Sequence, residues 1–239
     1  LFLFLRVKKF SLPLKKKNFF NYLFIAISGN VFPFFLVSWA EITINTNLTG
    51  IIMGLMPITT VFLAFFFVKE EKINLYTFLG IFLGFTGLFF LLEVSKGNST
   101  NLESQLAVII ATISFAIATI YTRKIPNFNP LFVLTGSTYL AFFILIPLVL
   151  IFDSPLNIGA TNQSIFFGIV LGVLNTAIGG LIFFKLIKLS GAAFTSTVNF
   201  ITPFVAIIWG YIFLNESLSP NQILSFLFIL TGIYLVKKS

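Results

Sequence analysis

Cysteine and histidine are both absent from this chain of 239 residues, and Asp153 is its single aspartate. The chain therefore has no disulfide, no thiolate nucleophile, no imidazole base and none of the usual zinc ligands. A pair of aspartates for acid and base catalysis is excluded in the same way. We expect that the protein is not an enzyme, and we expect neither a metal site nor a cofactor.

Charged residues are also scarce. They make up 9% of the chain against 58% of hydrophobic residues, and the mean hydropathy is +1.05. A soluble protein of this length needs many more charges to cover its surface, whereas lipid covers apolar side chains on every face. The composition therefore predicts a membrane protein.

Eight apolar runs follow a basic stretch at residues 6–17. A hydrocarbon core of about 30 Å takes about 20 helical residues to cross, and each run is near that length. The five apolar residues before Arg6 are too few to span, so we interpret them as the remnant of a truncated helix, with an interfacial start as the alternative. We predict an all-α, polytopic membrane helix bundle with helices at 19–40, 48–67, 75–92, 105–122, 131–152, 164–184, 193–214 and 221–236.

Lysine and arginine gather on one side of the membrane when alternate loops are assigned to opposite faces. Of the 15 basic residues, only Lys96 falls on the other side. Loops rich in Lys and Arg stay in the cytoplasm. We therefore predict a multi-pass protein of the plasma (inner) membrane with a cytoplasmic C-terminus. Topology explains the net charge of +8, and no nucleic-acid partner is expected.

The chain repeats itself at an offset of 146 residues. Pro57 aligns with Pro203 and Glu70 aligns with Glu216, and a Thr-Gly pair follows in the next helix of each copy. The matched helices are five apart, and an odd separation makes them run in opposite directions, so the repeat is inverted. Secondary transporters combine an inverted repeat with helices that are broken near the midplane, and they bind substrate between the halves.

The two segments that carry these matches read "MGLMPITTVFLAFFFVKE" and "VNFITPFVAIIWGYIFLNE". Each has a proline, a dozen mostly apolar residues, a glutamate and then a helix containing Thr-Gly, and in this the chain resembles the EamA family of the drug/metabolite transporter (DMT) superfamily. The resemblance covers essentially the whole chain. It implies two five-helix repeats, ten helices in all, with an N-terminally incomplete first repeat at 1–92 and a second at 102–237.

Each proline is predicted to break its helix, because it cannot bond the carbonyl group four residues back. The carbonyl groups left free belong to Met53 and Asn199, and a purely structural kink is the alternative. Polar side chains at similar depth are predicted to line one central substrate cavity, although hydrogen bonding between helices is the other role open to each. The predicted cavity residues are Asn30, Thr59, Thr60, Asn175, Thr176, Asn199 and Thr202, together with Trp209 as an aromatic near the outer end.

Glu70 and Glu216 are expected at opposite membrane faces, since their helices run in opposite directions. Ending the helix and ordering the next turn is the first interpretation of these carboxylates, and a gating or coupling role is the second. No carboxylate lies securely at the midplane, so the sequence shows no proton relay.

Together these features predict a permease that moves amino-acid-like or other neutral to zwitterionic solutes, in the direction of efflux, by alternating access between the repeats. The alternatives are a non-transporting membrane scaffold and a carrier of phosphorylated sugars or nucleotide sugars. The second of these is disfavoured, because a phosphate calls for a deep Lys or Arg. A small-molecule substrate and the lipid bilayer are the expected partners, and a homodimer stays open.

Overall fold

The computed structural model describes residues 12–13, 16–44, 46–68, 74–91, 101–152, 161–201 and 220–238, and within them the regular structure is entirely helical. The prediction of an all-α membrane helix bundle is confirmed. Four helical stretches are long and apolar enough to cross a membrane: Lys16–Ala40, Leu102–Lys124, Pro130–Ile151 and Asn162–Ser196. Large apolar side chains stay exposed on their outer faces, for example Phe166 and Phe167, as lipid contact requires.

The first part of the chain forms one long rod, one broken helix and one short helix. Residues Gly54 and Leu55 form a turn in the middle of the predicted helix 48–67, directly before Pro57. Proline is tolerated in the first turn of a helix because its missing N–H has no intrahelical partner there. The elements are α2 (Lys16–Ala26), η1 (Ile27–Val31), α3 (Phe32–Ala40), α4 (Thr46–Met53), α5 (Met56–Phe67) and α6 (Leu75–Leu91).

The second part contains three long helical stretches and the C-terminal helix. The predicted end of the helix at residue 184, before the next helix at 193, is wrong, because the helix continues through Ser190 and turns only at Gly191, whose φ is 83° and ψ is 173°. Glycine adopts positive φ without steric cost, so it makes this turn. The elements are α7 (Leu102–Lys124), α8 (Pro130–Phe152), α9 (Asn162–Leu171), η3 (Gly172–Gly179), α10 (Gly180–Ser196) and α12 (Pro220–Lys238).

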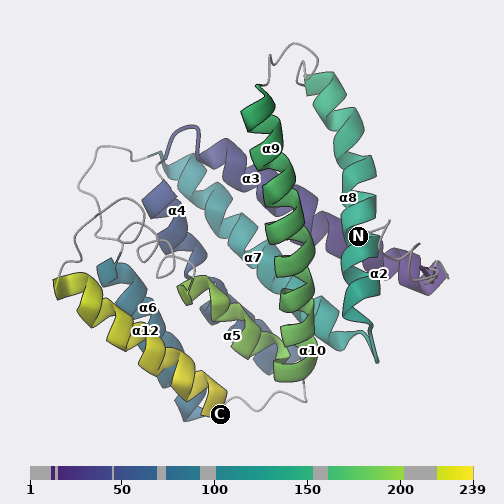
Figure 1. Ribbon diagram of the computed structural model, residues 1–239. Helices are drawn as coiled ribbons and strands as arrows, with labels where there is room; N and C mark the ends of the chain where they lie inside the picture. The colour runs from purple at the N-terminus through teal and green to yellow at the C-terminus, as the bar shows by residue number, and fades with distance from the viewer. Residues whose placement is uncertain are drawn as a thin grey trace.

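Helix α7 lies at the centre of the bundle and contacts α3, α5 and α10. Figure 1 shows α6 and α12 side by side at one edge, while α8 and the α9–α10 rod stand at the other. The α6–α12 crossing is very close: a Cβ atom on Gly232 would lie 2.7 Å from the backbone nitrogen of Gly84. Small residues let two membrane helices approach in this way.

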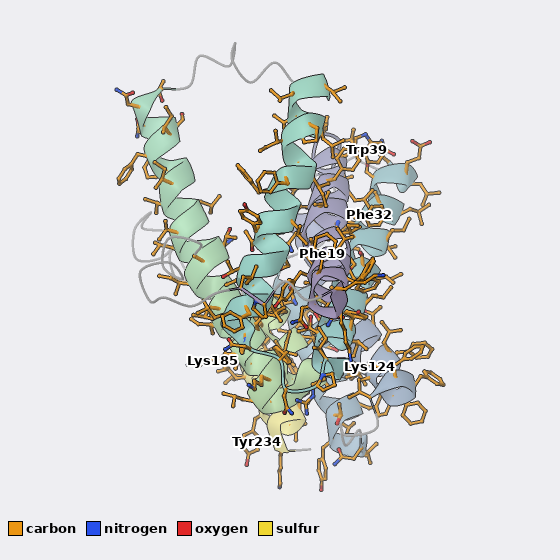
Figure 2. The ribbon with its side chains drawn as sticks, turned by 90° about the vertical axis from the view of Figure 1, so that its right-hand side faces the viewer. Phe19, Phe32, Trp39, Lys124, Lys185 and Tyr234 are labelled. Carbon is orange, nitrogen blue, oxygen red and sulfur yellow. The ribbon has the colours of Figure 1, made fainter. Side chains whose placement is uncertain are left out.

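The inverted relation of the repeats can be followed in Figure 2. Trp39 and Lys185 are 146 residues apart in sequence, yet they lie at opposite ends of the molecule. Phe19 and Phe32 precede Trp39 on the rod that rises toward one end, whereas Lys185 lies on a rod that descends toward the other. The two rods, α2–η1–α3 and α9–η3–α10, therefore occupy matching positions in the repeat with opposite direction.

Two buried clusters hold the rods around the centre. One contains Tyr22, Ile25, Phe128, Val133 and Ile187, and it joins α2 to α8 and α10. The other joins α5 to α7 and α10. Burying such side chains stabilises the contact by packing, since lipid removes most of the hydrophobic driving force between helices. The residues of the second cluster are Ala64, Val68, Ile120 and Ala192.

Candidate functional site

A cavity of about 500 Å³ lies where the two rods approach α7 and the broken helix. Four of the predicted substrate residues line it, namely Asn30, Asn175, Thr176 and Asn199. They come from η1, from η3 and from the helical residues 198–201 that follow the turn at Thr197. A cavity of this size has the volume typical of a small-molecule site.

The two rods contribute matching irregularities to the cavity wall. The η1 segment is a π-helix over 27–31, and the offset of 146 residues carries it onto 173–177, inside the π-helix η3. Sustained π-helix is rare, and π-bulges occur frequently at functional sites. Asn30 lies in η1 and Asn175 in η3, so each repeat presents an asparagine to the same cavity from a widened turn.

Side chains support the wider turn of η1. The Ser114 hydroxyl on α7 donates to the Ser28 carbonyl oxygen at 2.7 Å, which gives that oxygen a partner outside its own helix. The Asn30 amide donates through Nδ2 to the carbonyl oxygen of Ile25 at 3.4 Å. At Gly29 an added Cβ atom would lie 3.0 Å from the Cβ of Ala118, so the absence of a side chain lets α7 come close.

The helix break of the first repeat also reaches the cavity. Met53 and Met56 line it from the two sides of the turn, and Pro57, which follows, has no N–H to donate to the Met53 carbonyl. The Asn199 amide donates through Nδ2 to the Met56 sulfur at 3.0 Å and to the Ser196 carbonyl oxygen at 3.0 Å. Asn199 is the repeat counterpart of Met53, so this contact joins the broken helix of the first copy to the matching segment of the second.

Thr59 and Thr60 lie outside the cavity wall. The Thr59 hydroxyl donates to the carbonyl oxygens of Leu55 and Met56 at 3.0 Å and 2.9 Å, within its own helix. Thr60 is fully buried, one helical turn before Ala64 on the face that packs against α7 and α10. The other predicted residues, Thr202, Pro203, Trp209, Glu70 and Glu216, lie outside the described residues, so their roles stay predictions.

Aromatic rings and threonines complete the wall, and the sequence did not single them out. Phe34 and Phe115 meet edge to face with centroids 5.5 Å apart, and Phe183 and Phe184 stand beside η3. With 34 phenylalanines in the chain, no pattern distinguishes these four. Thr119 and Thr122 follow Phe115 at helical spacing, and that spacing on the central helix is the signal that could have found them.

Known proteins resemble the chain over most of its length. It is 23% identical to a Bacillus subtilis protein described as an uncharacterized transporter, YoaV, over 98% of this chain and 81% of that protein. It is 26% identical to an uncharacterized transporter of Buchnera aphidicola over 92% of this chain and 73% of that protein. A chloroplast WAT1-related protein of Arabidopsis thaliana is 29% identical over 90% of this chain and 53% of its own length.

One solved crystal structure superposes with a TM-score of 0.83 at 13% identity, covering 98% of this chain and 82% of that one, which shows a shared fold. The family model of the EamA-like transporter family matches residues 1–93 and 103–237. The membrane helix bundle, the relatives and this family match all indicate a membrane transporter. The chain is a membrane transporter that belongs to the EamA-like transporter family of the drug/metabolite transporter superfamily.

Proposed function

We propose that this transporter moves small neutral or zwitterionic metabolites, amino-acid-like compounds among them, out of the cell by alternating access. The observation that carries the proposal is a cavity walled by two matching π-helices, one from each repeat. Substrate bound there contacts both repeats, so a rocking of one against the other changes the side from which the cavity is reached.

In this proposal, the two parts of the protein that move against each other are the two repeats, at 1–92 and 102–237. Support comes from the two separate stretches that the family model matches and from the opposite ends at which Trp39 and Lys185 lie. Asn199 after α10 contacts Met56 of the broken helix in the first repeat, and in this proposal the contact forms and breaks as the repeats move. Glycine contacts such as Gly80 with Gly232 allow helices to slide past each other.

The remaining parts of the proposal concern location and chemistry. Lys124 and Lys185 lie toward the same end of the molecule, which supports a cytoplasmic face at that end and a cytoplasmic C-terminus. We place the protein in the plasma (inner) membrane, acting by transport without catalysis and without nucleic acid. Carriage of phosphorylated sugars is disfavoured, since the described residues that line the cavity include no Lys or Arg.

The test begins with a screen of cells that express the chain for tolerance to amino acids and their toxic analogues. Export of a solute found in this way is then measured with Asn175→Leu, which removes the cavity amide of η3. Asn162→Leu on the same rod is the matched control, because both positions are exposed and Asn162 does not line the cavity. We expect export to fall at least about tenfold in the first variant and to persist in the second. Equal export by both variants would show that the cavity assignment is wrong.

A further inference from the structure

The hydrogen-bond donors of the cavity wall are mostly engaged within the protein. Each of four lining side chains donates to a backbone carbonyl oxygen of its own segment. The threonine hydroxyls have no further proton, and Asn199 donates its second N–H to the Met56 sulfur, whereas Asn30 keeps one N–H. The bonds run from Thr119 Oγ1 to Phe115 at 2.8 Å, from Thr122 Oγ1 to Ala118 at 2.8 Å, from Asn30 Nδ2 to Ile25 at 3.4 Å and from Asn199 Nδ2 to Ser196 at 3.0 Å.

For a ligand these side chains keep mainly acceptor capacity, together with one N–H of Asn30, although Thr122 is fully buried. A threonine hydroxyl has one proton to donate and two lone pairs, and an asparagine amide has a carbonyl oxygen that accepts two bonds. Once the hydroxyl proton of Thr119 is directed to the Phe115 carbonyl, only its lone pairs remain for a solute. Asn175 and Thr176 across the cavity can donate as well as accept, so they suit a neutral polar group.

The apolar part of the wall includes aromatic rings and thioether sulfurs. Rings of Phe34, Phe115 and Phe183 line the cavity together with the thioethers of Met53 and Met56. The face of an aromatic ring attracts a cation placed within about 6 Å of its centre. Among the described residues that line the cavity there is no acidic or basic side chain, so a ligand meets oxygen acceptors and rings without a fixed counter-charge.

We propose that the substrate class of this cavity is small organic amines, bound as ammonium ions with an apolar or aromatic body. The inference rests on the proposed function for the cavity and for export, and it departs from that proposal in charge, since the favoured solute is a cation rather than a neutral or zwitterionic compound. The ammonium N–H groups donate to the free lone pairs of the wall, and the body packs against the phenylalanines and methionines. A carboxylate or phosphate needs several donors, and the described lining side chains offer them at Asn175, Thr176 and one N–H of Asn30, so anions of the same shape bind less tightly than the amine.

The test compares three probes that share one phenyl body and differ in the head group: 2-phenylethylamine, 2-phenylethanol and 3-phenylpropionate. Binding of each radiolabelled probe to the purified full chain in detergent is measured by equilibrium dialysis. Because hydrogen bonds to a charged group contribute about 1.5–3 kcal/mol, we expect the amine to bind at least about tenfold more tightly than the anion, with the alcohol between them. This comparison uses the unaltered chain and needs no variant.

A matched pair of variants then locates the binding. Thr119→Val removes the lone pairs at the cavity and keeps the side-chain shape, while Thr231→Val makes the same change on the exposed face of α12. Both hydroxyls donate to the carbonyl four residues back, at 2.8 Å and 2.7 Å, so each variant loses the same kind of bond within its helix. We expect about fivefold weaker amine binding for Thr119→Val and no change for Thr231→Val.

Three results would overturn the inference. The inference fails if the anion binds as tightly as the amine, if Thr119→Val leaves amine binding unchanged, or if none of the three probes binds. The proposed function is judged separately, by export of a solute from the tolerance screen and its loss in Asn175→Leu. A transporter that exports another solute and ignores all three probes would therefore keep its proposed function and lose the proposed substrate class.

Discussion

At the scale of single residues, the bond from Ser114 to the Ser28 carbonyl is the contact that ties η1 to α7. We expect Ser114→Ala to destabilise the protein by about 1 kcal/mol, because a part-buried carbonyl oxygen of the π-helix loses its partner. The measurement is thermal unfolding in detergent. Thr112→Val on the same helix is the control. The Thr112 hydroxyl donates to the Val108 carbonyl oxygen, which already accepts a backbone hydrogen bond within α7. A larger loss in the control would contradict the role given to Ser114.

The sequence predicts which types of residue line the cavity better than it predicts which face of its helix each residue occupies. Asn30, Asn175 and Asn199 were predicted to line a cavity and they do, because an amide in a membrane helix turns toward protein or a polar space. Thr59 and Thr60 were predicted beside them and lie elsewhere. A helix that is apolar on every side carries no stripe to fix its rotation, so the sequence leaves open which face each threonine occupies.

At the scale of helices, the α6–α12 crossing depends on a glycine. A Cβ atom on Gly232 would lie 2.7 Å from the Gly84 nitrogen, whereas a Cβ atom on Gly168 in α9 would meet nothing within 4 Å. We expect Gly232→Ala to lower the free energy of unfolding by about 1–3 kcal/mol through overpacking. Gly168→Ala should raise it by about 0.5–1 kcal/mol, because alanine favours helix over glycine. Thermal unfolding of both variants in detergent would test this, and equal shifts would contradict it.

The presence of each helix could be predicted from its own stretch of sequence, whereas its π-helical segments and turns could not. The ends at 122 and 152 were predicted to within two residues, since apolar length and polar flanks depend on the chain alone. The π-helix at 27–31 was missed because its support comes from Ser114, a distant residue that donates to the Ser28 carbonyl. The turn at Gly191 was misplaced because the lysines before it were interpreted as a loop, whereas they extend the helical rod.

At the scale of the whole molecule, charge asymmetry predicts how the bundle sits in the membrane. Glu103 lies in the first turn of α7, and Arg123 and Lys124 lie in its last turn, so the central helix itself runs from an acidic end to a basic one. Such an arrangement agrees with the helix dipole and with the retention of basic residues in the cytoplasm. In the chain as a whole, 15 basic residues outnumber 7 acidic ones.

The absence of cysteine makes this orientation directly measurable, since one introduced thiol is the only site a maleimide can label. We expect Glu103→Cys to react with a membrane-impermeant maleimide in intact cells, because the predicted outer end carries it. Lys238→Cys should react only after permeabilisation, since the C-terminus is predicted to be cytoplasmic. Both side chains are exposed, so equal labelling after permeabilisation is the internal control. Labelling of Lys238→Cys but not of Glu103→Cys in intact cells would invert the topology and, with it, the direction proposed for transport.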